Sequence, residues 1–200
     1  MLIIGTGGLA KDIAGNISRY VDREQYVFYN DIEGNTDRLF LNNYKIIKSK
    51  EEAAVYLKNT DNNFIAALAN PLMRMRLSNK FMDMGGVLKT LIFTDFKAIS
   101  DFTNIGNGCL VQYGVIISSN TIIGEGTFIN CGVIIGHDIT IGKYCSFGPG
   151  VRILGGVEIG EFSYIGCNAV IMPGVKIGKK VRIGVGKIIE KDVPDNSKII

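Results

Sequence analysis

Residues 129–156 read INCGVIIGHDITIGKYCSFGPGVRILGG, and a large apolar residue returns in this stretch at every sixth position. The same period continues in both directions without a slip, through fifteen positions. These positions are Ile105, Val111, Ile117, Ile123, Ile129, Ile135, Ile141, Phe147, Ile153, Ile159, Ile165, Ile171, Ile177, Ile183 and Ile189. The next residue is often glycine, and the fifth position of each hexad is small or β-branched. The frame can be extended back to Ile99 or Phe93.

A strict period of six fits neither an α-helix, which repeats every ~3.6 residues, nor a simple strand, which repeats every ~2. It fits a short strand followed by a turn, and three such units close a triangular coil of 18 residues. The large residue then points into the prism, and the glycine lies where the backbone turns and side chains would crowd. We therefore predict a parallel β-helix over residues 91–200.

The coil geometry also bears on the four cysteines. Cys109 and Cys145 are 36 residues apart, as are Cys131 and Cys167, so each pair is separated by two coils, or ~9.6 Å. That distance exceeds the reach of a disulfide. We expect reduced cysteines that pack within the repeat, which suits a reducing compartment. Cys131 could carry an acyl group, but a small apolar repeat residue needs no such role.

Residues 1–90 follow a different pattern, in which short apolar strands alternate with helical segments. This alternation predicts a small Rossmann-like domain with a parallel sheet. Strands are predicted at 2–4, 26–29, 64–68 and 87–93, and helices at 9–20, 51–57 and 71–84.

Gly5, Gly7 and Ala10 follow the first predicted strand with the spacing of a dinucleotide-binding loop, and Asn30-Asp31 ends the next strand. Backbone amides at a helix N-terminus suit a phosphate. Four strands supply little more than half of a dinucleotide fold, so a mononucleotide or the nucleotide part of an activated sugar fits better. The alternative is that the glycines form only a tight turn.

A glycine-rich α/β domain joined to six-residue coils resembles the sialic acid O-acetyltransferase and nucleotide-sugar N-acetyltransferase family of hexapeptide-repeat acyltransferases. The resemblance covers nearly the whole chain and rests most on four residues, Asn130, His137, Asp138 and Gly155. It implies left-handed coils, although physical principles alone favour a right-handed crossover. It also implies acetyl-CoA as cosubstrate and a homotrimer with CoA between neighbouring prisms.

Several positions depart from the family pattern. They are Leu9, where a His can stand, Leu68-Ala69-Asn70 in place of Ile-Gly-Asn, Phe93-Thr94 in place of His-Pro, and an end at Ile200 before the usual tail. The sugar, the nucleotide base, the effect of the tail on CoA binding and the choice between N- and O-acetylation therefore stay open.

His137 is the only histidine in the chain. Acyl transfer needs a base near neutral pH, and histidine is the usual one. As the third residue of its hexad His137 should lie outside the prism, near a corner. Gly155 follows 18 residues later and should stack over it, with an amide that could stabilise an oxyanion. Asp138 could orient the imidazole. The alternatives are a surface histidine and ordinary turn residues without a role.

The remaining predicted contacts concern the two substrates. For acetyl-CoA they are Asn130, Ser146, Gly155, Lys179 and Lys187, with the lysines near the phosphates. For the sugar nucleotide they are Gly5, Thr6, Gly7, Gly8, Asn30, Asp31 and Asn70. A merely solvated surface of lysines is the alternative for the first set.

Composition excludes several other functions. A net charge of +3 without a basic run gives no support to nucleic-acid binding. No apolar run approaches the ~18 residues of a membrane span, and the N-terminus lacks the features of a signal peptide, so we expect a cytoplasmic protein. One histidine cannot build the three-histidine site of a γ-type carbonic anhydrase, and we expect no metal. A dehydrogenase would need a second nucleotide-binding half.

The sequence therefore predicts an enzyme that moves an acetyl group from acetyl-CoA directly to an amino group of a nucleotide-linked amino sugar, in surface-glycan biosynthesis, with a histidine base. The alternatives are O-acetylation of a sialic acid or another free sugar, and a non-catalytic β-helix that binds sugars or serves as a scaffold.

Overall fold

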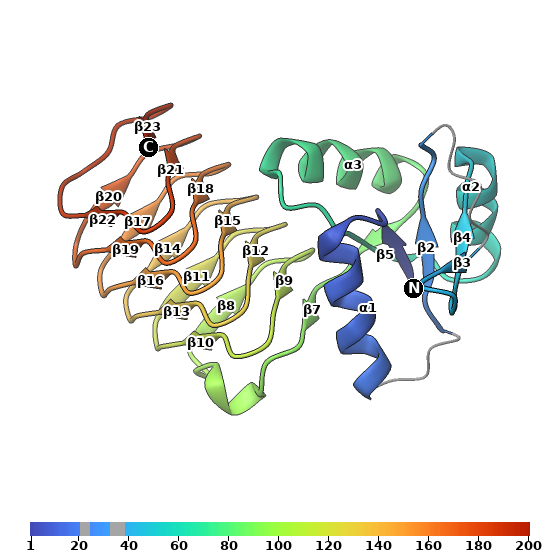
Figure 1. Cartoon of the computed structure of the whole chain (residues 1–200), viewed down its shortest axis with the longest axis horizontal. Coiled ribbons are helices and arrows are strands. Elements are labelled where there is room, and N and C mark those ends of the chain that lie inside the picture. The colour runs from blue at the N-terminus through green and yellow to red at the C-terminus, as the bar shows by residue number, and fades with distance from the viewer. Residues whose placement is uncertain (21–24, 33–38) are drawn as a thin grey trace. The chain divides into compact units, whose positions relative to one another are not determined.

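The computed structural model describes residues 1–20, 25–32 and 39–200, and these fall into two compact units (Figure 1). The first unit comprises Met1–Ala69 with Met73–Lys89, and the second comprises Asn70–Leu72 with Thr90–Ile200. Within the described ranges, every helix is too short or too polar to cross a bilayer.

The first unit is built around one six-stranded sheet in the order β3-β4-β2-β1-β5-β6. Its strands are β1 (Leu2–Ile4), β2 (Val27–Tyr29), β3 (Leu39–Phe40), β4 (Tyr44–Ile47), β5 (Asn63–Ala66) and β6 (Val87–Leu88). Only the β3–β4 pair is antiparallel. This hairpin was not predicted from the sequence, because its strands of two and four residues are too short to show a period.

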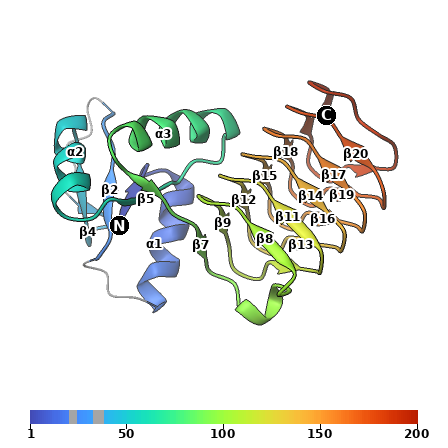
Figure 2. The same ribbon diagram turned by 180° about the vertical axis from the view of Figure 1, so that it is seen from behind.

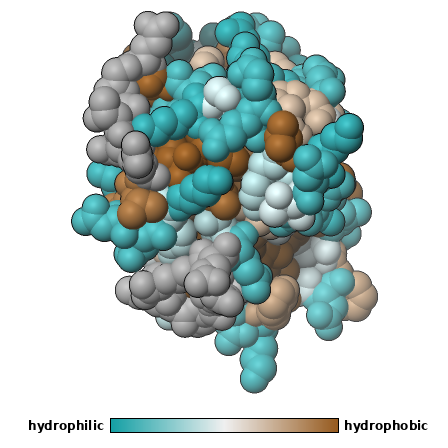
Figure 3. Space-filling model, turned by 90° about the vertical axis from the view of Figure 1, so that its right-hand side faces the viewer, coloured by the Kyte–Doolittle hydropathy of each residue, from teal (hydrophilic) through white to brown (hydrophobic). Residues whose placement is uncertain are grey.

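Three helices connect the parallel strands: α1 (Gly8–Tyr20), α2 (Lys50–Asn59) and α3 (Pro71–Asp83). Each begins and ends within a few residues of its predicted range. At the start of α2 the side chain of Ser49 accepts a hydrogen bond from the N–H of Glu52, which satisfies one of the free amides of the first turn. On the face of the molecule shown in Figure 3, hydrophobic residues are interspersed among hydrophilic ones.

The order of the parallel strands matters for ligand binding. Numbered along the chain, the five parallel strands lie in the order third, second, first, fourth, fifth, so the direction of winding reverses between β1 and β5. In open α/β sheets, ligands bind at the carboxyl ends of the strands at this reversal. The first unit thus has one more parallel strand than predicted, and its strand order is that of a nucleotide-binding fold.

The predicted strand at 87–93 is wrong as a single element. Leu88 pairs with β5 in the first unit, whereas β7 (Leu91–Ile92) pairs with the first coil of the second unit. Ile92, not Phe93, lies opposite the inward Val111. Ile99 lies opposite Ile117, as the period requires. One extra residue between 92 and 99 therefore displaces the frame at its start.

The second unit is a stack of coils with three parallel sheets, one on each side of the prism (Figures 1 and 2). The β8 sheet contains β8 (Thr103–Ile105), β11 (Thr121–Ile123), β14 (Thr140–Ile141), β17 (Glu158–Ile159) and β20 (Lys176–Ile177). The β10 sheet contains β10 (Ile116–Ile117), β13 (Ile134–Ile135), β16 (Arg152–Ile153), β19 (Val170–Ile171) and β22 (Ile188–Ile189). The β7 sheet contains β7, β9 (Leu110–Val111), β12 (Phe128–Ile129), β15 (Ser146–Phe147), β18 (Tyr164–Ile165), β21 (Arg182–Ile183) and β23 (Lys198–Ile199).

Strand register follows the 18-residue repeat through most of the stack, as in the pairing of Ile135 with Ile153 and then Ile171. The inward residues at every sixth position and at the fifth position of each hexad form one continuous apolar core. Parallel strands stacked in this way satisfy each other's backbone hydrogen bonds, and the prism is filled by side chains. The predicted β-helix is confirmed.

The glycine that follows the inward residue has a specific steric cause. A Cβ atom on Gly142 would lie 2.5 Å from the backbone nitrogen of Glu161 in the next coil, a distance that real Cβ atoms do not adopt. Its φ lies outside the left-handed region, unlike that of Gly156 at +73°. Glycine is required at Gly142 because the next coil approaches closely, not because the backbone turns.

The cysteines divide into two groups, all of them free. Cys109 and Cys145 are buried in the prism, as predicted for packing residues. Cys131 is exposed and Cys167 is partly exposed, because both lie at a turn between sheets. The prediction that Cys131 packs within the repeat is therefore wrong.

Candidate functional site

His137 lies on the turn between β13 and β14, two residues beyond the inward Ile135. Its side chain is 69% exposed. The hexad frame forces this position outward, because the inward places before and after it are taken by Ile135 and Ile139. The only histidine of the chain is therefore open to a substrate. We call this turn, with the turns stacked directly above and below it, the His137 corner.

The imidazole of His137 is held by the next residue. Its Nδ1 atom lies 2.7 Å from Oδ2 of Asp138. Hydrogen bonds from Asn120 and then from His137 lower the pKa of Asp138 below its ordinary value, so the carboxylate is ionised at neutral pH. An ionised carboxylate can only accept, so Nδ1 carries the proton. In the neutral ring the lone pair is then on Nε2, which is the atom that can take a proton.

Asn120 is a part of this corner that sequence analysis missed. Its Nδ2 atom donates to Oδ1 of Asp138 at 2.6 Å. Asn120 and Asp138 are one coil apart and share a left-handed backbone, with φ of 56° and 57°. The coil spacing that pointed from His137 to Gly155 would also have pointed from Asp138 back to Asn120.

Gly155 lies against the histidine ring. A Cβ atom at Gly155 would be 2.7 Å from both Cε1 and Nε2 of His137. The N–H of Gly156 donates to the carbonyl oxygen of His137 at 3.0 Å, which fixes the two coils to each other. Among the hydrogen bonds of the described chain, the N–H of Gly155 has no acceptor. A base, its orienting carboxylate and an available amide donor therefore lie together at one corner.

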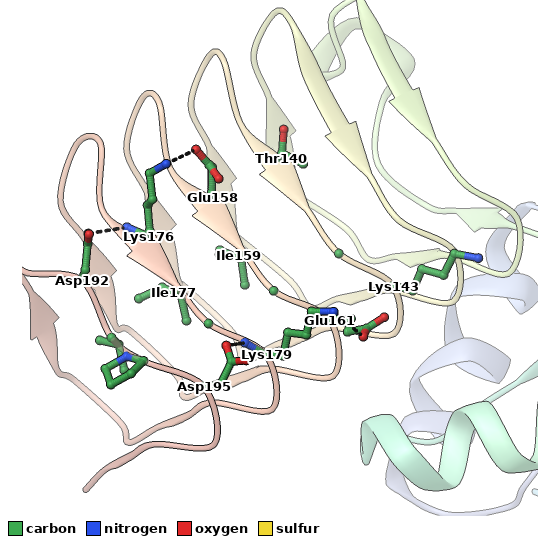
Figure 4. Close-up of a pocket in the computed structure, with 15 residues that line it drawn as sticks. Thr140, Lys143, Glu158, Ile159, Glu161, Lys176, Ile177, Lys179, Asp192 and Asp195 are labelled. Atoms are coloured by element: carbon green, nitrogen blue, oxygen red, sulfur yellow. Dashed lines mark hydrogen bonds and ion pairs between the residues drawn. The ribbon is translucent and has the colours of Figure 1, made fainter.

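A groove of about 660 Å³ runs along the outer side of the β8 sheet (Figure 4). Lys179 lines it and forms a salt bridge with Glu161 at 3.1 Å, while its backbone N–H donates to Asp195 at 2.7 Å. Lys176 is paired in the same way with Glu158 at 2.9 Å. Lys179 was predicted to meet a phosphate of CoA, but in this structure its ammonium already has an anionic partner.

The other residues predicted to contact acetyl-CoA lie away from the His137 corner. Asn130, between β12 and β13, uses its side-chain oxygen to accept from the N–H of Cys131 at 2.8 Å. Ser146 on β15 is only 1% exposed, so its hydroxyl is closed to a ligand in this structure. Lys187 is half-buried between β21 and β22. The structure brings together His137, Asp138 and Gly155, but not these three.

The loop after β1 combines a structural glycine with open ones. Gly5 has φ +111°, and a Cβ atom there would lie 3.3 Å from the carbonyl oxygen of Ala67. Around Gly7 and Gly8, the described chain places no atom within 4 Å of an added Cβ. These two glycines are not required by packing, and they leave room for a ligand at the N-terminus of α1.

Asn30 and Asp31, predicted as a pair, have different partners. The Nδ2 atom of Asn30 donates to the hydroxyl of Thr6 at 2.7 Å, which ties the end of β2 to the glycine loop. Asp31 accepts instead from the hydroxyl of Tyr29 at 2.7 Å and lies 3.6 Å from the Lys80 ammonium. Burial first, and then the hydrogen bond to Asp31, raises the pKa of Tyr29. Asn30 is thus part of the loop, whereas Asp31 is engaged by the chain itself.

The loop after β5 completes this edge of the sheet. Asn70 is exposed immediately before α3. Arg74, only 2% exposed, donates from Nη1 to the carbonyl oxygens of Leu68 at 2.6 Å and Ala69 at 3.2 Å. An arginine in a helix gave no signal in the sequence that it would fix this loop. The loops after β1, β2 and β5 all leave the carboxyl edge around the reversal of winding.

Within the described ranges, His, Cys, Asp and Glu residues form no group of three or more that could hold a metal ion.

A family model of the bacterial transferase hexapeptide, with six repeats, matches residues 120–155 and 156–191. These two ranges include every residue of the His137 corner. Comparison with curated protein sequences gave no match.

Several solved structures share the fold of nearly the whole chain. A variant of perosamine N-acetyltransferase from Caulobacter crescentus, in complex with CoA and GDP-perosamine, is 26% identical, with a TM-score of 0.86 over 98% of this chain and 91% of that chain. The acetyltransferase domain of PglB from Neisseria gonorrhoeae, in complex with acetyl coenzyme A, is 24% identical, with a TM-score of 0.85 over 98% and 93%. WeeI from Acinetobacter baumannii is 24% identical, with a TM-score of 0.80 over 98% and 94%. The matches at 24% show the fold alone.

Proposed function

We propose that this chain, a hexapeptide-repeat acyltransferase of the left-handed β-helix type, transfers the acetyl group of acetyl-CoA to an amino group of a nucleotide-linked amino sugar. The observation that carries the proposal is the His137 corner, where Nδ1 is bound by Asp138 and Nε2 faces solvent beside Gly155. The proposal gains support from the structure in complex with CoA and GDP-perosamine, which shares 26% identity over 98% of this chain.

The geometry suggests how the reaction proceeds. The acceptor nitrogen, deprotonated to its free amine, attacks the thioester carbon, and Nε2 of His137 takes a proton from nitrogen as the new C–N bond forms. The thioester oxygen becomes negatively charged, and the N–H of Gly155 can donate to it. The tetrahedral intermediate then collapses, the C–S bond breaks and CoA leaves as the thiol. Asp138 supports the imidazolium without taking its proton.

Direct transfer requires both substrates to be bound at once, so proximity supplies much of the rate. We therefore expect sequential kinetics. Ping-pong kinetics would indicate a covalent intermediate instead. The exposed thiol of Cys131 is the residue to examine for an acetyl group in that case.

The first unit would bind the nucleotide part of the acceptor at the loops after β1, β2 and β5. Gly7→Ala tests this, because the added methyl group meets nothing in the described chain and should obstruct only a ligand. The Michaelis constant for the sugar nucleotide should rise and that for acetyl-CoA should stay unchanged. Gly15→Ala on α1, where an added Cβ also has open space, is the matched control. Equal constants for both variants would separate this unit from substrate binding.

We further propose a homotrimer in the cytoplasm. The outer side of the β10 sheet carries apolar side chains at Ile116, Ile134, Val170 and Ile188, of which Ile188 is 63% exposed. An apolar column of this kind suits burial against a second copy of the prism. The free cysteines suit a reducing compartment. A monomeric mass by light scattering at micromolar concentration would refute the trimer.

The function itself is tested with UDP-, GDP- and CMP-linked amino sugars and acetyl-CoA, by following release of free thiol and the mass of the product. We expect His137→Ala to lower kcat by about 10²–10⁴-fold, the usual contribution of a positioned base. The fold and acetyl-CoA binding should be retained, because His137 points outward. A product acetylated on oxygen would favour O-acetylation. No turnover with any acceptor, together with no binding of acetyl-CoA, would favour a non-catalytic β-helix.

A further inference from the structure

We propose that Asn120 is a positioning residue that holds Asp138 in the orientation needed to bind Nδ1 of His137. The catalytic part of this inference rests on the function proposed above. The structural part concerns only the three side chains, and it can be tested without any substrate.

The two oxygens of the Asp138 carboxylate have different partners. Oδ1 accepts from Nδ2 of Asn120 at 2.6 Å, and Oδ2 lies 2.7 Å from Nδ1 of His137. The side chain of Asp138 is 57% exposed, so packing alone does not restrict its rotation. Because Asn120 binds one oxygen, the other stays directed at the imidazole.

Asn120 is itself anchored by the coil repeat. It lies 18 residues before Asp138, and the backbone N–H of Asp138 donates to the carbonyl oxygen of Ser119 at 3.1 Å. The left-handed backbone at both positions, which Asn and Asp tolerate better than most residues, gives the stacked side chains the same course away from the corner. A carboxamide in one coil therefore reaches the carboxylate in the next.

The consequence concerns which ring nitrogen is basic. A neutral imidazole can carry its proton on either nitrogen, and the hydrogen bond made by one nitrogen decides the state of the other. With Asp138 fixed on Nδ1, the lone pair is on Nε2. If the carboxylate rotates away, water can bind Nδ1 and part of the population carries the proton on Nε2, where it cannot act as a base.

The test uses Asn120→Gly, which removes the carboxamide and suits a φ of 56°. Asn120→Asp is the second variant, because it keeps the shape and tolerates the backbone but cannot donate to Asp138. Asn168→Gly is the matched control, since Asn168 has φ 55° on a different corner. Thermal unfolding checks that each variant folds.

Because His137 is the only histidine, ¹⁵N imidazole spectra of the whole protein report its tautomer without ambiguity. We expect one tautomer, protonated on Nδ1, in the wild type and in Asn168→Gly, and a mixture in both Asn120 variants. We expect kcat to fall roughly tenfold in the Asn120 variants with both Michaelis constants unchanged, a loss of the size seen for residues that orient a functional histidine.

An Asn120→Gly protein with the wild-type tautomer would overturn the proposal, and so would Asn120→Asp with the wild-type tautomer if the glycine variant fails to fold. A wild-type kcat in a folded Asn120 variant would overturn the catalytic part. Failure of the proposed function is distinguishable, because it leaves the tautomer spectra unchanged and abolishes only the turnover measurements.

Discussion

Gly155→Ala is the sharpest test of the geometry at the His137 corner. The added methyl carbon would lie 2.7 Å from Nε2 and Cε1 of His137, whereas ordinary contact begins at 3.4 Å. The backbone can accept alanine, because φ of Gly155 lies outside the left-handed region. The exposed imidazole must therefore move by about 0.7 Å while the coil stays as it is.

A displacement of ~1 Å can cost about 10²-fold in rate. We thus expect kcat to fall roughly 30- to 100-fold, equivalent to ~2–2.7 kcal/mol of barrier. The free energy of unfolding should change by less than ~0.5 kcal/mol, as for other surface substitutions. The assay is steady-state thiol release on the sugar nucleotide, with urea unfolding in parallel.

A double-mutant cycle isolates the cause. If the methyl group acts through the ring, His137→Ala with Gly155→Ala should be no slower than His137→Ala alone. The reasoning is refuted if Gly155→Ala keeps more than half of the wild-type kcat, or if it costs the same factor when His137 is absent.

Two further predictions concern the scaffold. Gly142→Ala should destabilise the β-helix by about 1–3 kcal/mol in urea unfolding, because the clash at 2.5 Å is with backbone that cannot rotate away; Gly7→Ala, which adds a methyl group in open space, should cost far less. The hydrogen bond from Tyr29 lowers the pKa of Asp31, against the opposing effect of burial and with help from the charge of Lys80. Asp31 therefore contributes stability that is fully present above about pH 3.9 and is lost as the pH falls through its lowered pKa. The acid limb of a pH–stability curve should be shallower for Asp31→Asn, and an identical limb would contradict this account.

The β-helix could be predicted from the sequence because its signal is long and its geometry leaves one register. Fifteen matches at one period define the inward positions, and the 18-residue coil predicts which residues stack. The same arithmetic led from His137 to Gly155, which the structure places against the ring. It was not applied to Asp138, and Asn120 was missed for that reason alone.

Other features depend on contacts that no period encodes. The exposure of Ser146 and the partner of Lys179 are set by neighbours whose positions a repeat does not specify. The hairpin of β3 and β4 and the break at Lys89 and Thr90 involve strands too short for a pattern to appear. The roles of the site residues stay predictions, as does binding of a nucleotide by the first unit.

The His137 corner draws on three successive coils, through Asn120, then His137 with Asp138, and then Gly155. In a stack where each coil touches only its neighbours, gain or loss of one whole coil leaves the others in register. An in-frame duplication or deletion elsewhere along the gene could thus lengthen or shorten the prism and spare the reactive corner. The same event within residues 120–155 would yield an intact, well-folded and inert descendant, so lineages of such proteins can shed activity in one step without passing through an unfolded ancestor.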